Sequence, residues 1–154
     1  MFICLVQHAK ATSEEADPTR PLCEKGRADI TKMASYASGL NIGINEIFHS
    51  PKLRAKQTAQ VLADYLKPAK GLTETGGLKP NDDPAVWAER LKMMADNIML
   101  VGHLPQLGKL ASLLLCGDAD KNLVAFEMAG IVCLKRDENM AWALRWMITP
   151  EMVI

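Results

Sequence analysis

The sequence predicts an α/β protein in three layers, with helices flanking a mostly parallel central sheet that has a mixed edge toward its C-terminal part. Two apolar runs, residues 2–6 and 98–101, lack polar alternation, which is typical of strands buried on both faces. Segments with helical spacing follow the predicted strands, and the last third of the chain carries strands in succession. The length suffices for one sizeable core and no linker interrupts it, so residues 1–154 are expected to form one domain.

The first strand and helix are separated by a long loop. Residues 2–6 are expected to be the strand and the polar, irregular stretch 9–22 the loop. A helix is predicted over residues 24–38, ended by Gly39 and Gly43. It is predicted because apolar side chains recur at helical spacing, namely Ile30, Met33, Ala34 and Ala37.

A second strand is expected at residues 46–49. The Ser-Pro pair at 50–51 is expected to supply the cap and first-turn proline of a helix that runs to about residue 66. Residues 68–82 are rich in Gly, Pro, Asn and Asp and are expected to be mostly loop, with a short strand near Leu72.

Two more helices are predicted around the strand at 98–101. The Asp-Pro pair at 83–84 is expected to start the first of them, with three apolar residues in register, Trp87, Leu91 and Met94. Pro105 is expected to open the second, with four apolar residues facing inward, Leu107, Leu110, Ala111 and Leu114.

The last third of the chain is predicted to be strands. Residues 123–128 and 131–134 are apolar enough for two of them, and residues 142–148 alternate in a way that indicates a strand with two unlike faces. One face of this last strand is expected to join the core through Trp142, Leu144, Trp146 and Ile148. The two tryptophans are expected to be core rather than a base-stacking platform, because no basic residues are interleaved with them.

Composition argues against several classes of partner. Eighteen basic side chains balance eighteen acidic ones, so no global field favours nucleic acid or an anionic membrane surface. No secretory signal and no apolar run of about 20 residues is present, so no membrane span is expected. The cysteines lack zinc-site spacing and are expected to stay reduced in a cytoplasm, with no structural metal: Cys4, Cys23, Cys116 and Cys133.

Three residues are expected to converge at one edge of the sheet. His8 and His103 follow the two buried strands, and Arg54 lies in the first turn of the helix after the second strand. Ligands of open parallel sheets gather at the carboxyl ends of the strands. The three side chains can therefore meet although they are far apart in sequence.

This trio suits phosphoryl transfer through a covalent intermediate. A neutral imidazole is a competent nucleophile when a hydrogen bond on its other nitrogen fixes the tautomer. Arginine forks, a second histidine and helix N-terminal amides stabilise the charge on the transferring group, so no metal or other cofactor is required.

The sequence resembles the histidine phosphatase superfamily, and within it the short SixA-like phosphohistidine phosphatases. The most specific match is S-P-x-x-R-A-x-Q-T-A at residues 50–59. The other matching stretches follow the family's order: Leu5-Val6-Gln7-His8-Ala9, Arg20-Pro21-Leu22, Val101-Gly102-His103 and Trp146-Met147-Ile148-Thr149-Pro150. The resemblance spans nearly the whole chain and implies a phosphoglycerate mutase-like fold.

The resemblance also implies roles for individual residues. His8 would be phosphorylated during turnover, while Arg54 and His103 hold the phosphoryl oxygens. Arg20, in the loop after the nucleophile, would reach toward the same pocket. His49 has no counterpart in the family pattern and is expected either to lie behind the site residues and support them or to be merely structural.

Gln7 departs from the family pattern. The superfamily signature begins Arg-His-Gly, and this chain has Gln7-His8-Ala9. A hydrogen bond to a charged group contributes roughly 1.5–3 kcal/mol, against about 1 kcal/mol for a neutral one. The change is therefore expected to weaken or narrow the activity, unless Arg20 or Lys10 replaces the missing charge.

A general acid is not evident. Relatives that act on phosphate esters place a carboxylic acid in the mid-chain loop, where it protonates the leaving oxygen. Such general acid catalysis raises the reaction rate roughly 10²–10⁴-fold. Here a glycine stands where the acid is expected, and Glu74 and Asp82 are the nearby carboxylates. A phosphohistidine substrate eases this demand, because protonated imidazole is a good leaving group.

The expected function is a metal-independent phosphatase that passes a phosphoryl group to His8 and then to water. Its substrate would be a phosphohistidine-bearing signalling or phosphotransfer protein, or a small phosphorylated molecule. Two alternatives remain open: a phosphate- or phosphohistidine-binding module with little turnover because of Gln7, and a mutase, which the short chain disfavours. The sequence leaves the oligomeric state open.

Overall fold

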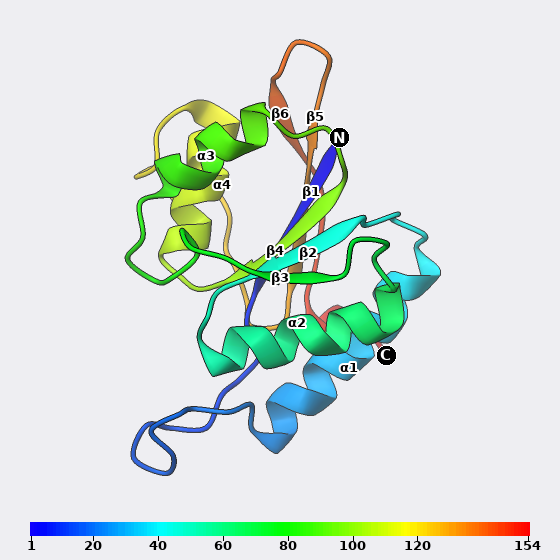
Figure 1. Cartoon of the computed structure of the whole chain (residues 1–154), viewed down its shortest axis with the longest axis vertical. Helices are drawn as coiled ribbons and strands as arrows, with labels where there is room; N and C mark the ends of the chain where they lie inside the picture. Colours follow the sequence, from blue (N-terminus) through cyan, green and yellow to red (C-terminus); the bar gives the residue numbers. More distant parts are fainter.

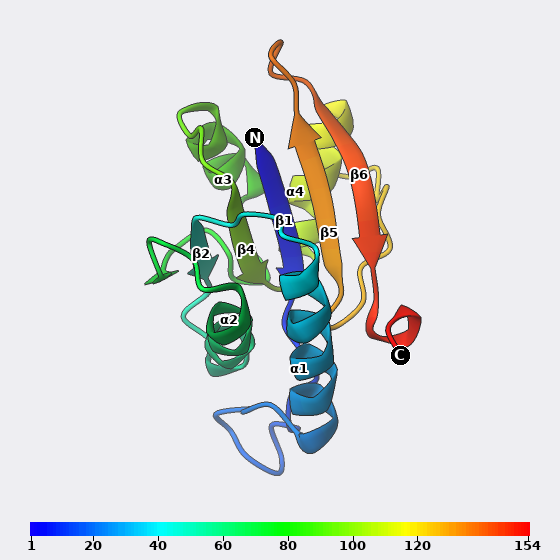
Figure 2. The same ribbon diagram turned by 90° about the vertical axis from the view of Figure 1, so that its right-hand side faces the viewer.

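The computed structural model describes residues 1–154 and contains one six-stranded sheet in the order β3-β2-β4-β1-β5-β6. Neighbouring strands from β3 to β1 run parallel, whereas β5 is antiparallel to β1 and β6 to β5 (Figure 2). The predicted parallel sheet with a mixed C-terminal edge is therefore confirmed. The strands are β1 (Phe2–Gln7), β2 (Glu46–His49), β3 (Leu72–Glu74), β4 (Ile98–Gly102), β5 (Ile131–Arg136) and β6 (Trp142–Ile148).

Four helices cover the two faces of the sheet (Figure 1). The helices α1 (Glu24–Gly39) and α2 (Leu53–Leu66) pack together on one face, and α3 (Pro84–Lys92) and α4 (Gln106–Cys116) pack together on the other. A short 3-10 turn, η1 (Pro150–Met152), follows β6 and contacts α1. None of the helices is both long and apolar enough to cross a membrane.

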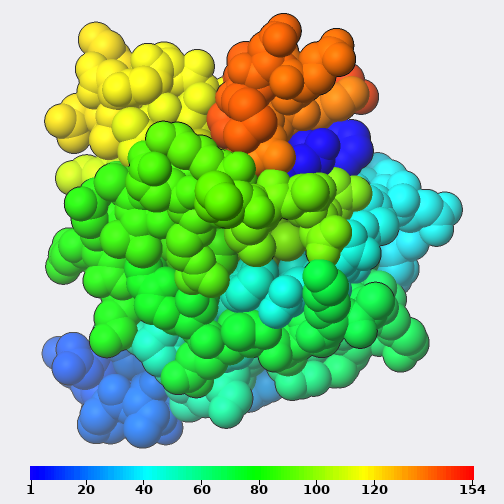
Figure 3. All heavy atoms as spheres, turned by 45° about the horizontal axis from the view of Figure 1, so that its top comes forward, coloured from blue at the N-terminus to red at the C-terminus, as the bar shows by residue number.

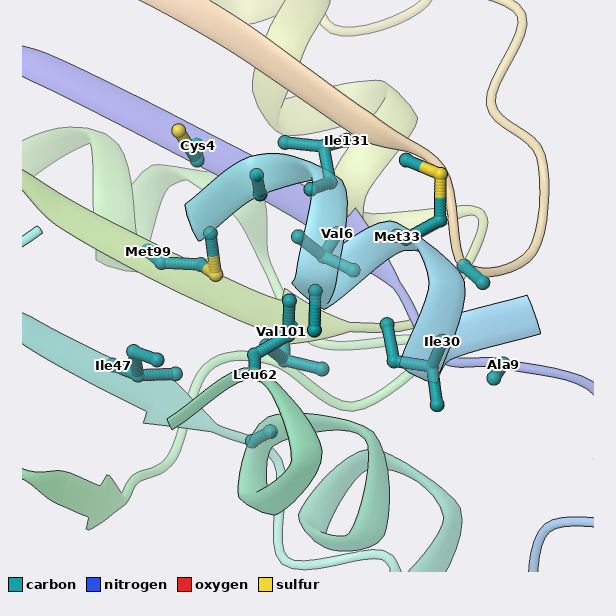
Figure 4. Packing of buried hydrophobic residues seen from close by; sticks show 14 of the residues in the cluster. Cys4, Val6, Ala9, Ile30, Met33, Ile47, Leu62, Met99, Val101 and Ile131 are labelled. Carbon is teal, nitrogen blue, oxygen red and sulfur yellow. The ribbon is translucent and has the colours of Figure 1, made fainter. Parts of the chain in front are cut away.

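Alternate residues of the central strands fill two separate cores. Cys4 and Val6 of β1 pack toward α1 and α2, as Figure 4 shows, whereas Ile3 and Leu5 pack toward α3 and α4. All four side chains are fully buried, and complete burial of a large apolar side chain contributes about 1.5–3 kcal/mol. The central strands are thereby held firmly, which fixes the positions at which they end.

The strand predicted over residues 123–128 is wrong. This segment is an irregular loop beside α4, where the Leu123 backbone N–H donates to the Ser112 hydroxyl oxygen (3.1 Å) instead of to a neighbouring strand. Val124 is buried in the core of α3 and α4, while the Leu123 side chain is half exposed. The segment is apolar because it packs beside α4, not because it joins the sheet.

The single core face predicted for the last strand is also wrong. The pairing of β5 and β6 shifts between Cys133, opposite Trp146, and Leu134, opposite Leu144. This bulge breaks the two-residue alternation of the strand. Trp142 consequently packs against the core of α3 and α4, and Trp146 packs against the core of α1 and α2.

The loop between β1 and α1 projects from the body of the molecule beyond the end of β1 (Figure 1 and Figure 3). A bridge between Ala11 and Leu22 closes its base. Gly26 lies so close to the loop that an added Cβ would be 2.0 Å from the Lys10 carbonyl oxygen. Only glycine fits there, and the contact ties the residues after His8 to the start of α1.

Candidate active site

The structure brings His8, His103 and Arg54 together at the carboxyl edge of the sheet. The His8 backbone N–H donates to the Gly102 carbonyl (3.0 Å), so β1 and β4 end side by side. The centroids of the two imidazole rings are 5.0 Å apart, with the rings tilted by 53°. Arg54, in the first turn of α2, places its Nε 3.4 Å from the His8 Nε2.

The His8 ring is held in one tautomer. Its Nδ1 lies 2.7 Å from the Ala9 carbonyl oxygen, which can only accept a hydrogen bond, so Nδ1 carries the proton. The pKa of His8 is lowered to about 4, mainly by burial and with smaller contributions from the charges of Arg54 and Arg20, against the opposing effect of the Ala9 carbonyl. At neutral pH the ring is neutral and its Nε2 lone pair is available.

His103 is buried more deeply and is also neutral. Its Nε2 lies 2.9 Å from the hydroxyl oxygen of Ser50. Burial lowers the pKa of His103 to about 3, with smaller contributions from His8, Arg54, Lys52 and Arg20. Lys52 is thus a further positive charge near the site to which the sequence analysis gave no role.

The predicted capping role of Ser50 is wrong. The N-cap of α2 is Lys52, whose side chain makes no capping hydrogen bond. The Ser50 side chain instead turns inward to His103, and its oxygen accepts only a long hydrogen bond (3.3 Å) from the Lys52 backbone N–H. The start of a helix offers only N–H donors, whereas a buried imidazole nitrogen can also accept the proton of the hydroxyl.

Two polar side chains of α2 tie this helix to the two ends of the loop between β1 and α1. The Thr58 hydroxyl donates to the Arg54 carbonyl (2.7 Å) and accepts from the Ala9 backbone N–H (2.9 Å). The Gln57 side-chain oxygen accepts from the backbone N–H of Leu22 (2.8 Å). Both residues stand in the motif that was recognised, but their partners are distant in sequence and could not be read from it.

Arg20 lies within electrostatic range of the site. Its backbone adopts a positive φ of 48°, and its Nε donates to the Thr12 carbonyl (3.1 Å). Its charge contributes to lowering the pKa values of His8, His103 and Arg54. The loop therefore adds a second guanidinium to the surroundings of the two histidines.

Gln7 and Lys10, which are close to His8 in sequence, line a depression with a volume of about 390 Å³. Leu104, Phe126 and Met128 form its apolar part. Lys10 is exposed to solvent, whereas the Gln7 side-chain oxygen is buried and has no hydrogen-bond partner. Gln7 thus supplies polar but uncharged groups where the superfamily signature has an arginine.

All buried side-chain nitrogen and oxygen atoms without a hydrogen-bond partner lie at this edge of the sheet. They are Gln7 Oε1, His103 Nδ1 and Gln106 Oε1. Gln106, the first residue of α4, had no role in the sequence analysis, and its Nε2 donates to the Gly77 carbonyl (2.9 Å). Because an unpaired buried polar atom is costly, such a group of atoms indicates a site for a polar ligand.

A family model described as histidine phosphatase superfamily (branch 1) matches residues 3–79, half of the chain. The chain belongs to this superfamily. SixA, the phosphohistidine phosphatase of Escherichia coli, is 25% identical over 155 residues, which cover 97% of this chain and 94% of SixA. An uncharacterised protein of Picosynechococcus sp. is 33% identical, with 77% of this chain and 73% of that protein covered.

The solved structure of SixA complexed with tungstate has the same fold as this histidine phosphatase. The TM-score is 0.85 at 25% sequence identity, and the match covers 97% of each chain. The predicted phosphoglycerate mutase-like architecture is confirmed, and the protein is a SixA-like member of a family of hydrolases.

The remaining predicted candidates lie outside the trio. His49 is buried at the end of β2, and its Nδ1 is 2.9 Å from the Ser50 carbonyl oxygen. The Asp82 carboxylate accepts from the Lys79 backbone N–H (2.9 Å), and Glu74 is exposed at the end of β3. The structure contains no cluster of three or more His, Cys, Asp or Glu side chains that could hold a metal ion.

Proposed function

We propose that this histidine phosphatase removes phosphoryl groups from phosphohistidine on a signalling or phosphotransfer protein, with His8 as nucleophile. The observation that carries the proposal is the neutral His8 ring, whose unprotonated Nε2 lies beside the Arg54 guanidinium and the His103 ring. Residues 1–154 would act as a single domain in the cytoplasm, where its four free cysteines stay reduced.

The reaction has two steps. In the first, the His8 Nε2 attacks phosphorus, a new N–P bond forms, and the bond to the substrate imidazole breaks as that ring leaves with a proton. In the second, water attacks phosphorus, the bond to His8 breaks, and inorganic phosphate leaves with His8 neutral again. Arg54, His103 and Arg20 stabilise the negative charge on the phosphoryl oxygens in both steps, so no metal is needed.

The absence of an evident general acid favours a phosphohistidine over a phosphate ester. The two aspartates of the mid-chain loop have structural partners, since Asp82 accepts from Lys79 and Asp83 caps α3 through the Ala85 N–H. A phosphohistidine leaving group brings its own proton, whereas an alkoxide must be given one. The likeness to SixA along nearly the whole chain supports the same preference.

The proposal is tested with wild type and His8→Ala, each incubated without added metal with a phosphohistidine protein and with a chromogenic phosphate ester. Wild type should turn over the phosphohistidine protein faster than the ester, and His8→Ala should turn over neither. His49→Gln is the matched control, because it alters a buried histidine outside the trio and should retain most of the activity. Equal turnover by His8→Ala and wild type would contradict the proposal.

A binding module with little turnover is the second candidate, favoured by Gln7, which lacks the positive charge of the arginine in the superfamily signature. It predicts that wild type binds inorganic phosphate or tungstate but releases no phosphate from either substrate. Isothermal titration with both anions, run beside the turnover assay, separates the two candidates.

A further inference from the structure

We propose that Ser50 is a positioning residue that holds the His103 imidazole with its proton on Nδ1, so that this N–H is offered to the transferring phosphoryl group. The inference rests on the proposed function and deepens it, because it assigns the hydrogen-bonding role of His103 to a neighbour that does not touch the substrate.

The pair is isolated from water. Ser50 is fully buried and His103 is 1% exposed. The serine oxygen and the His103 Nε2 are 2.9 Å apart, a distance typical of a strong hydrogen bond. Both residues follow strands of the sheet, β2 and β4, which pair directly with each other, so the rigid sheet fixes their separation.

The direction of the hydrogen bond follows from the partners of the serine oxygen. It accepts from the Lys52 backbone N–H (3.3 Å), and its only other hydrogen-bond partner is the His103 Nε2. A fully buried hydroxyl needs an acceptor for its own proton, and Nε2 is the acceptor in reach. Ser50 therefore donates, Nε2 accepts, and the ring proton resides on Nδ1.

This choice of tautomer matters because the ring is neutral. Burial holds the pKa of His103 far below neutral pH, so the ring has one N–H, not two. Its Nδ1 is buried and has no partner within the protein. With the proton on Nδ1 the ring donates to a phosphoryl oxygen, whereas in the other tautomer it would turn a lone pair toward a negative charge.

The two histidines would then use the same tautomer for opposite purposes. In His8 the Nδ1–H is held by the Ala9 carbonyl, which leaves the lone pair of Nε2 for attack. In His103 the lone pair of Nε2 is held by Ser50, which leaves the Nδ1–H for the anion. The Ala9 carbonyl thus leaves His8 as the nucleophile, and the Ser50 hydroxyl leaves His103 as the hydrogen-bond donor.

The first test is spectroscopic. Long-range ¹H–¹⁵N NMR of the wild-type protein at neutral pH should show the His103 proton on Nδ1, and tungstate should shift the resonance of that nitrogen. In Ser50→Ala the two tautomers should mix. A wild-type ring protonated on Nε2 would overturn the proposal, and this readout stands even if Ser50→Ala does not fold or if the protein proves not to be a phosphatase.

The second test is kinetic. Ser50→Ala should lower kcat and kcat/KM by the same factor, roughly tenfold, as expected for loss of about 1.4 kcal/mol in the transition state. Ser50→Thr keeps the hydroxyl and should restore most of the rate. Ser112→Ala is the matched control, because it removes another fully buried serine hydroxyl, one that bonds to the Leu123 N–H far from the site. An unchanged kcat in folded Ser50→Ala would overturn the proposal.

Discussion

Gln7 stands directly before the nucleophile, at the position where the superfamily signature has an arginine. We expect Gln7→Arg to raise kcat/KM roughly tenfold, because a hydrogen bond from a charged group contributes about 1.5–3 kcal/mol, against about 1 kcal/mol from a neutral amide. The measurement is steady-state turnover of a phosphohistidine protein and of a chromogenic ester at one ionic strength.

Gln7→Lys is the control for that substitution, since it adds the charge without the planar fork. An intermediate gain in Gln7→Lys would show that charge and geometry both count. Unchanged or lower activity in Gln7→Arg would mean that Arg20 already supplies the missing charge and that a third guanidinium only repels the other two.

The residues that sequence reasoning could name are those that carry chemistry on their own. His8, Arg54 and His103 are recognisable as an imidazole pair and a guanidinium at the ends of predicted strands and in a first helical turn. Ser50 was assigned a local capping role because its true partner, His103, lies 53 residues away. Residue type reveals a nucleophile or a cation, but the partner of a hydroxyl is known only once the chain has folded.

The Thr58 hydroxyl links the segment after β1, which carries His8, to α2, which carries Arg54. We expect Thr58→Val to cost about 1–3 kcal/mol of unfolding free energy, because it leaves the buried Ala9 N–H without an acceptor. Activity should fall as well, since the 3.4 Å approach of Arg54 to His8 is no longer held. Urea unfolding and steady-state kinetics measure the two effects.

Thr58→Ser keeps the hydroxyl of that link and is expected to behave nearly as wild type. If Thr58→Val lost stability but kept full activity, the hydroxyl would stabilise the fold without setting the distance between His8 and Arg54. If Thr58→Ser were as impaired as Thr58→Val, the methyl packing rather than the hydrogen bonds would be responsible.

Strands were predictable where burial is uniform along them, and their prediction failed where burial changes along the segment. The runs in β1 and β4 are buried on both faces, so their apolar sequence identifies them directly. The bulge in β6 has no sequence signal, because regular alternation puts Trp142 and Trp146 on the same face, and only the register shift places them against different cores. Residues 123–128 are apolar like a strand, but Val124 is buried by packing in the core of α3 and α4 and the Leu123 N–H bonds to Ser112 of α4, and an apolar run does not distinguish such packing from strand pairing.

At the scale of the whole molecule, the fold keeps two imidazoles uncharged well below the pH at which a free histidine takes up a proton. His8 and His103 follow the ends of the central strands β1 and β4, beside guanidinium groups and with no carboxylate among the groups that shift their pKa values. Burial and the neighbouring cations both keep the nucleophile neutral, and this links the chemistry of the site to the stability of the fold.

This linkage predicts that the protein loses stability in mild acid. Folding lowers the pKa values of His8 and His103 to about 4 and about 3, whereas in the unfolded chain both titrate near their ordinary value of about 6.5. Above that value neither state binds these protons and the stability is fully present; as the pH falls toward 4, the unfolded chain takes them up and the free energy of unfolding decreases. Each histidine changes the free energy of unfolding by at most about 1.4 kcal/mol per pH unit.

Urea unfolding at pH values of about 7 and about 5, in buffers free of oxyanions, should show a clear loss of unfolding free energy for wild type and a smaller loss for His8→Asn. Equal losses in the two proteins would mean that His8 titrates alike in the folded and unfolded states, and that the site does not hold its nucleophile neutral by burial.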